Sequence, residues 1–174
     1  MKKQLWGIAA FSAVVTILVA ALLLANWVPL ALQKETLRRY NSIEEVRAAL
    51  PGKVLYVPSY FPQQVSWPPW KILAQGKQFQ ASVMEFKRAG SDEVVLVISQ
   101  AEGSFNTDRD IALTTVTEQA QYVMKGRTAT LLVGFCRNGE PCSRMNWNEG
   151  GCAMTVTMRS EPVELTRISE SMLH

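Results

Sequence analysis

The feature that most constrains this chain is an uninterrupted apolar run from Leu5 to Leu32, which contains no Asp, Glu, Lys or Arg. An α-helix rises about 1.5 Å per residue, so roughly 20 apolar residues cross the hydrocarbon core of a bilayer. Trp6 and Trp27 lie near the two ends of the run, where indole rings favour the membrane interface. The sequence therefore predicts an N-terminal membrane anchor, a single transmembrane helix within residues 1–32.

A cleaved signal peptide is the alternative explanation of this run. Lys2 and Lys3 would then form its basic n-region. The run is longer than the usual apolar h-region of about 7–15 residues, and Ala21–Ala25 is a poor cleavage site. We therefore expect an uncleaved signal anchor.

The orientation of the anchor rests on two observations. Lys2 and Lys3 favour a cytoplasmic N-terminus, although basic residues also follow the run. Three cysteines cluster around predicted loops, which is typical of a disulfide in an oxidising compartment. They are Cys136, Cys142 and Cys152. We expect a single-pass protein of the cytoplasmic membrane, N-terminus inside, with its domain facing the periplasm or the cell exterior.

The remainder of the chain predicts a short stem, residues 33–41, and one α+β domain, residues 42–174. Ser42 and Glu45 form a capping box that starts a helix over Ile43–Leu50. Four prolines make Pro58–Pro69 irregular, and Glu102–Asp110 is a polar loop. Alternating and β-branched segments predict strands at Lys53–Val57, Trp70–Ala74, Phe79–Lys87, Glu93–Gln100, Thr114–Val123, Arg127–Phe135, Ser143–Trp147 and Cys152–Met158.

A second helix is expected at the C-terminus, capped by Ser160 with Pro162 in its first turn. Its apolar face would comprise Val163, Leu165, Ile168 and Met172. The sum is a curved antiparallel sheet with one face covered by two short flanking helices.

The segment Ile43–Leu173 resembles a bacterial extracytoplasmic domain of unknown biochemical function, found at the C-terminus of transmembrane anti-sigma factors. It is distantly similar to MucB/RseB and LolA-type domains. The similar pieces, in order, are Glu44-Glu45, Val57-Pro58-Ser59-Tyr60-Phe61-Pro62, Val123-Met124-Lys125-Gly126 with Thr128-Ala129-Thr130-Leu131, Asn146-Trp147-Asn148-Glu149-Gly150-Gly151, and Glu164 to Met172. The resemblance implies an extracytoplasmic location. Only four residues precede the apolar run, so no cytoplasmic sigma-binding domain and no direct sigma-factor binding are expected.

Several function classes are disfavoured by composition. Residues 33–174 carry 16 Lys and Arg against 15 Asp and Glu, so this part of the chain lacks the net positive charge expected of a nucleic-acid-binding domain. The only histidine is His174, the last residue, where a catalytic base cannot be held in place. Turn or edge carboxylates are expected to be solvated, namely Glu85, Asp92 and Glu93, and Asp108 and Asp110 would hold at most a weak Ca²⁺. We therefore expect no catalytic activity, no bound cofactor and no bound metal.

The cysteines leave three pairings open. A Cys136–Cys142 bridge would close a small loop around Asn138-Gly139, and a bridge from either residue to Cys152 is the competitor. A three-cysteine zinc site lacks a fourth ligand. A reactive thiolate beside Arg137 or Arg144 would instead make the chain a thiol-redox enzyme.

The strongest interaction candidates are four aromatic residues set among prolines, Tyr60, Phe61, Trp67 and Trp70. A proline-rich backbone presents aromatic rings at low entropic cost, although the same rings could instead cap the core. The sequence favours a membrane-anchored, non-catalytic binding or accessory module that acts as adaptor, sensor or subunit. Its expected partners are membrane lipid and a larger membrane protein complex. The alternative is a lipid or lipoprotein carrier of LolA type.

Overall fold

The computed structural model describes residue 16 and residues 37–75, 80–102 and 111–173. The chain divides into two units, residues 1–37 and 38–174, and only the second is described below. Apart from Thr16, the predicted anchor lies outside the described residues. Within the described ranges, no helix is both long and apolar enough to cross a bilayer.

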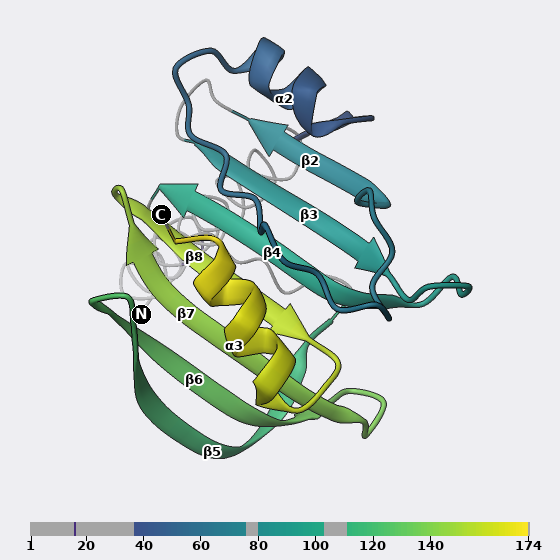
Figure 1. Cartoon of the computed structure of the whole chain (residues 1–174), viewed down its shortest axis with the longest axis vertical. Coiled ribbons are helices and arrows are strands. Elements are labelled where there is room, and N and C mark those ends of the chain that lie inside the picture. Colours follow the sequence, from purple (N-terminus) through teal and green to yellow (C-terminus); the bar gives the residue numbers. More distant parts are fainter. Residues whose placement is uncertain (1–15, 17–36, 76–79, 103–110, 174) are drawn as a thin grey trace, which may run out of the picture. The chain divides into compact units, whose positions relative to one another are not determined.

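The domain is an α+β structure built on one antiparallel sheet, as predicted (Figure 1). Its eight strands follow the order β1-β2-β3-β4-β8-β7-β6-β5, so only the β4–β8 contact joins strands that are not consecutive in the chain. The strands are β1 Arg38–Tyr40, β2 Lys71–Gln75, β3 Ala81–Lys87, β4 Val94–Glu102, β5 Leu113–Met124, β6 Arg127–Cys136, β7 Pro141–Glu149 and β8 Cys152–Met158. Seven of the eight correspond to predicted or slightly extended strands, and β1 was not predicted.

Helix α2, Ile43–Ala49, begins as its capping sequence predicts. The Ser42 hydroxyl accepts a hydrogen bond from the Glu45 amide at 3.1 Å. The Glu45 carboxylate reaches back to the Asn41 amide at 2.7 Å, one residue earlier than in the usual capping box. Ile43 and Val46 are the buried positions of this helix.

Helix α3, Pro162–Ser171, starts differently from the prediction. Its N-cap is Glu161, whose side chain makes no capping hydrogen bond, and Pro162 occupies the first helical turn. The Ser160 hydroxyl donates to the Glu161 carbonyl. Leu165 and Ile168 are buried as expected, but Val163 is 65% exposed. Val163 lies two residues before Leu165, and residues two apart on a helix do not share a face.

The core lies between one face of the sheet and the two helices, which pack on the same side (Figure 1). Helix α3 contacts β7 and β8, whereas α2 contacts β1. Fully buried side chains fill this layer, and methionine is prominent because its flexible thioether fits irregular gaps. The buried methionines are Met84, Met124, Met145, Met154, Met158 and Met172.

The predicted strand at Lys53–Val57 is wrong, because this segment is irregular. It runs across the sheet on the helix-covered side, and glutamine side chains satisfy its backbone. The Gln100 amide accepts from Tyr56 N–H at 2.9 Å and donates to the Val54 carbonyl at 2.6 Å. Gln80 also donates to Val54. Side-chain amides therefore replace the strand ladder that the β-branched sequence suggested.

Candidate interaction surface

Phe61 and Trp67 form an aromatic corner at the proline-rich segment. The Phe61 ring centroid lies 5.0 Å from that of Trp67 and 5.1 Å from that of the fully buried Phe86. Phe61 is partly buried, whereas Trp67 remains 54% exposed. Phe61 therefore anchors the corner in the core, and Trp67 presents half of its indole to the surface.

Trp70, directly before β2, is the second exposed indole of this region, at 50% exposure. Its amide donates to the Glu85 carbonyl at 2.8 Å, which ties its backbone to β3. The Lys87 ammonium lies 3.3 Å from the ring centroid, and the Arg39 guanidinium carbon lies 5.7 Å from it. Cations against the ring hold an otherwise exposed side chain in a fixed orientation.

Tyr60 is held against α3. Its hydroxyl donates to the Glu164 carboxylate at 2.8 Å, and the Arg167 guanidinium carbon lies 4.3 Å from the ring centroid. The hydrogen bond to Glu164 raises the pKa of Tyr60 above its ordinary value. Of the four predicted interaction residues, Tyr60 and Phe61 are partly buried and hold the segment in place, and Trp67 and Trp70 are about half exposed.

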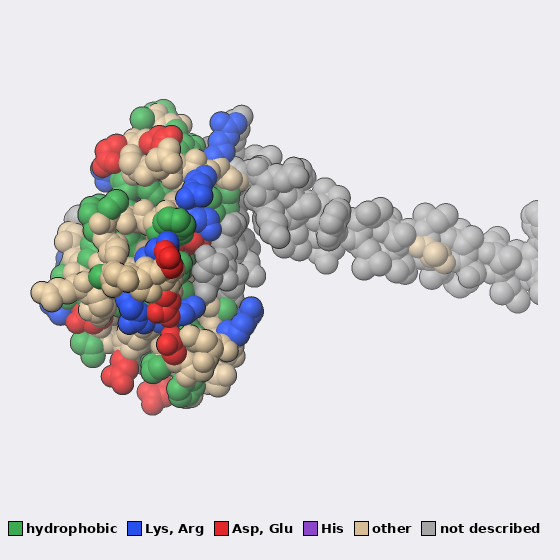
Figure 2. All heavy atoms as spheres, turned by 90° about the vertical axis from the view of Figure 1, so that its right-hand side faces the viewer, with side chains coloured by type: hydrophobic (Ala, Val, Ile, Leu, Met, Phe, Trp, Pro, Cys, Tyr) green, Lys and Arg blue, Asp and Glu red, His purple; other side chains and the backbone are tan. Residues whose placement is uncertain are grey.

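The carboxylates are engaged in ion pairs. Glu93 accepts from Arg88 at 2.9 Å and from Arg159 at 2.6 Å, and these bonds, that of Arg88 foremost, lower the pKa of Glu93. On the face shown in Figure 2, basic and acidic side chains lie close together in this way. The prediction of a solvated Glu85 is wrong, because it lies within β3, is 1% exposed and bonds the Lys71 ammonium at 3.0 Å.

No cluster of three or more potential metal ligands occurs among the residues that the structure describes. Asp108 and Asp110, the pair considered for weak Ca²⁺ binding, lie outside those residues.

Cys136 and Cys142 form a disulfide, with their Cα atoms 5.2 Å apart. The bridge closes the β6–β7 turn, in which the Cys136 amide donates to the Glu140 carbonyl at 2.9 Å. Cys152 is a free, buried thiol, and burial raises its pKa. A high pKa and low access disfavour a reactive thiolate.

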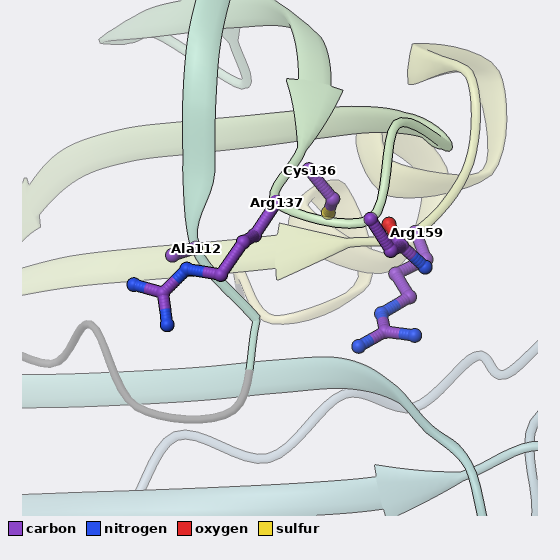
Figure 3. Close-up of a pocket in the computed structure, with 5 residues that line it drawn as sticks. Ala112, Cys136, Arg137 and Arg159 are labelled. Atoms are coloured by element: carbon purple, nitrogen blue, oxygen red, sulfur yellow. The ribbon is translucent and has the colours of Figure 1, made fainter.

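A hollow of about 320 Å³ lies beside the disulfide, lined by Ala112, Cys136, Arg137, Asn138 and Arg159. Figure 3 shows that the Arg137 and Arg159 side chains diverge, so that their guanidinium groups lie apart. Arg159 already pairs with Glu93 at 2.6 Å and approaches Glu140 at 3.8 Å. The charge of Arg159 is thereby offset, so this side chain is poorly suited to bind an anion in the hollow.

The sheet face opposite α3 carries a second hollow, of about 420 Å³, over β5, β6, β7 and β8. Neutral amide and hydroxyl side chains dominate its lining, and two of its contacts are hydrogen bonds: Thr155 to Asn146 at 3.0 Å, and Gln121 to Thr130 at 3.4 Å. Sequence reasoning missed this surface. The available signal is the alternation of neutral polar residues along the predicted strands, Thr128 and Thr130, then Asn146 and Asn148.

No protein-family model matches this chain, and neither the curated proteins nor the solved structures give a significant match. The resemblance to the C-terminal domains of anti-sigma factors therefore remains a prediction.

Proposed function

We propose that this chain is a membrane-anchored, non-catalytic binding module that engages a partner through Trp67 and Trp70. The observation that carries the proposal is that two indoles are about half exposed while each ring also contacts a neighbouring side chain. Trp67 packs against the anchored Phe61, and Trp70 lies against Lys87. Tryptophan is enriched among residues that dominate binding energy, and a fixed ring loses little entropy when a partner covers it.

The position of Trp70 along the chain favours a partner in or at the membrane. Strand β1 begins six residues after Leu32, and six residues extend about 20 Å at most. If the apolar run spans the bilayer, this reach limits how far the start of β1 can lie from the membrane surface. A larger membrane protein could then contact both this corner and the anchor. Small residues in the anchor would permit close helix packing, namely Gly7, Ala9, Ala10, Ser12 and Ala13.

The non-catalytic part of the proposal is supported by how the reactive groups are used. Glu85 and Glu93 are held in ion pairs, Cys142 is in a disulfide, and the Cys152 thiol is buried with a raised pKa. The thiol-redox alternative needs an accessible thiolate, which neither cysteine provides. The carrier alternative needs an apolar cavity under the helices, where the described core is instead packed with methionine and other apolar side chains.

The test is affinity purification of the full-length tagged chain in mild detergent, followed by mass spectrometry of the co-eluting proteins and lipids. We expect a stoichiometric membrane protein with the native chain and its loss from the Trp67→Ala/Trp70→Ala variant. Phe135→Ala is the matched control, because Phe135 is a 44% exposed aromatic residue in β6. Equal recovery from the tryptophan variant would overturn the role of the indoles, and a chain that carries only stoichiometric lipid would favour the carrier.

A further inference from the structure

The two terminal strands of the sheet differ in how well their edges are protected. Strand β1 has three residues, of which Arg38 and Arg39 are exposed. A short strand with charged side chains resists pairing with another chain. Strand β5, at the other end, has twelve residues, and nine of these are exposed. Glu118 is its only charged residue, and it contains no proline.

The first half of β5 is nonetheless irregular. Its register against β6 shifts between Leu113 and Thr115 and again between Val116 and Glu118. The Thr117 hydroxyl donates to the Val133 carbonyl at 3.1 Å, and Gly134 lets the Thr115 backbone approach so closely that a Cβ there would clash with it. Bulges of this kind protect an edge.

The second half, Gln119–Met124, pairs with β6 in unbroken register and has neither bulge nor charge. Its outer edge offers backbone donors and acceptors that a further strand can use. This six-residue segment is therefore the unprotected part of the edge.

We infer that Gln119–Met124 pairs antiparallel with the same segment of a second copy of this chain. The occupant follows from the side-chain pattern of the two faces. On the helix-covered face, Ala120 lies opposite Leu131 of β6, which in turn lies opposite Met145 of β7. On the polar face, Gln121 lies opposite Thr130. A strand that continues this sheet needs small or apolar side chains on the first face and neutral polar side chains on the second. Gln119 to Tyr122 have this alternation, and the exposed Val123 departs from it.

If two copies pair about a two-fold axis at Gln121, the opposed side chains are compatible in charge and in size. Antiparallel pairing about this residue places Gln121 opposite its equivalent and Ala120 opposite Tyr122, which sets a small side chain beside a large one. Glu118 lies opposite Met124, next to Lys125 of the other copy, so opposite charges are near each other. No like charges are opposed. The result is an isologous dimer in which the sheet and its neutral polar face continue across the axis.

Disulfide trapping of the full-length chain in lipid vesicles tests this inference directly. Opposed residues in an antiparallel pair have Cα atoms about 4.5–5.5 Å apart, within the range that a disulfide requires. Mild oxidation of Gln121→Cys should therefore give a covalent dimer. The native chain should not cross-link, because Cys136 and Cys142 are already bridged and Cys152 is buried. Ala153→Cys is the control, an exposed residue of the same face on β8.

A lysine variant tests the dimer independently if the cysteine itself perturbs strand pairing. Gln121→Lys places two ammonium groups opposite each other, which should weaken the dimer about tenfold in detergent, as measured by light scattering across a dilution series. Thr128→Lys adds the same charge to an exposed position of β6 and should leave the dimer intact. A monomeric native chain, a Gln121→Cys adduct with a different protein, or equal effects of the two lysines would overturn self-pairing.

Discussion

The Lys87 ammonium lies 3.3 Å from the centroid of the Trp70 ring while it donates a hydrogen bond to the Asp92 carboxylate at 2.6 Å. One side chain of β3 thus connects an exposed indole to the β3–β4 turn. Asp92 is fully exposed, and the hydrogen bond from Lys87 lowers its pKa. Because both partners of Lys87 are ionic or aromatic, its charge, rather than its alkyl chain, accounts for the orientation of Trp70.

Replacement of Lys87 by methionine should therefore loosen Trp70 without emptying the space beside it. An exposed cation–π contact contributes about 0.5–1 kcal/mol, so the domain should stay folded while the indole becomes more mobile. Fluorotryptophan NMR of the full-length chain measures this as a shifted and sharpened Trp70 signal, with the buried Trp147 as internal reference. Lys53→Met, which removes an exposed ion pair with Glu102, should leave the Trp70 signal unchanged. If both variants give the same spectrum, Lys87 does not orient the ring.

Gln100 should be essential for the irregular segment that precedes the prolines. It is 1% exposed, and its amide bonds Tyr56 N–H and the Val54 carbonyl. Gln100→Leu would fill a similar volume but leave the Tyr56 N–H without its acceptor, which costs about 1–3 kcal/mol, whereas Gln80 still donates to the Val54 carbonyl. We expect a lower free energy of unfolding and faster hydrogen exchange at Tyr56. Gln63→Leu, at an exposed position, is the control. Unchanged exchange at Tyr56 would show that other contacts hold the segment.

The Gln100 contacts also show where sequence reasoning succeeds and fails. Alternation, β-branched composition and Gly or Asn turns located seven strands, because these are local properties of the sequence; β2, β3 and β4, buried on both faces, were marked by their apolar composition. Lys53–Val57 has a strand-like composition, but its hydrogen-bonding partners are side chains some 25 to 45 residues away, which no local pattern encodes. The very short β1 was missed for a related reason, since three residues with two arginines carry no alternation signal.

The candidate site was predictable only in part. Aromatic residues between prolines mark Tyr60, Phe61, Trp67 and Trp70 as a group, yet all four could equally have been core residues. Which of these rings are buried depends on Phe86, which packs against Phe61, and on α3, which binds Tyr60. Both elements are distant in sequence. The Cys136–Cys142 pairing was one of the open alternatives, because connectivity cannot be deduced from spacing.

Protonation of Glu93 should destabilise the domain in acid, because the carboxylate then loses its ion pairs. Hydrogen bonds from Arg88 and Arg159 lower its pKa in the folded state, whereas an unfolded Glu titrates near about 4.3. The unfolded state therefore binds more protons between these two values. The stability contributed by Glu93 is fully present above the unfolded pKa and is lost as the pH falls through the folded pKa.

Glu93→Gln should accordingly lower the free energy of unfolding by about 1 kcal/mol at pH 7 and reduce the loss of stability as the pH falls below the unfolded pKa of the carboxyl group. Urea unfolding of the full-length chain at several pH values measures both effects. Glu161→Gln, at an exposed position, should leave the pH profile unchanged. A Glu93→Gln profile parallel to that of the native chain would mean that this carboxylate does not carry the acid sensitivity.

The Cys136–Cys142 bridge should stabilise the domain mainly by restricting the unfolded chain. For a loop with a sequence separation of 6, chain entropy predicts a contribution of about 2 kcal/mol. The Cys136→Ser/Cys142→Ser variant should therefore unfold at lower urea concentration and no longer respond to reductant. Reduction of the native chain should shift its unfolding to match the variant. Cys152 provides the internal control, because its buried, high-pKa thiol should resist alkylation until the domain unfolds and then react as a single free thiol under non-reducing conditions. Rapid alkylation of the folded protein, or a mapped bridge that includes Cys152, would contradict this arrangement and reopen the thiol-redox alternative.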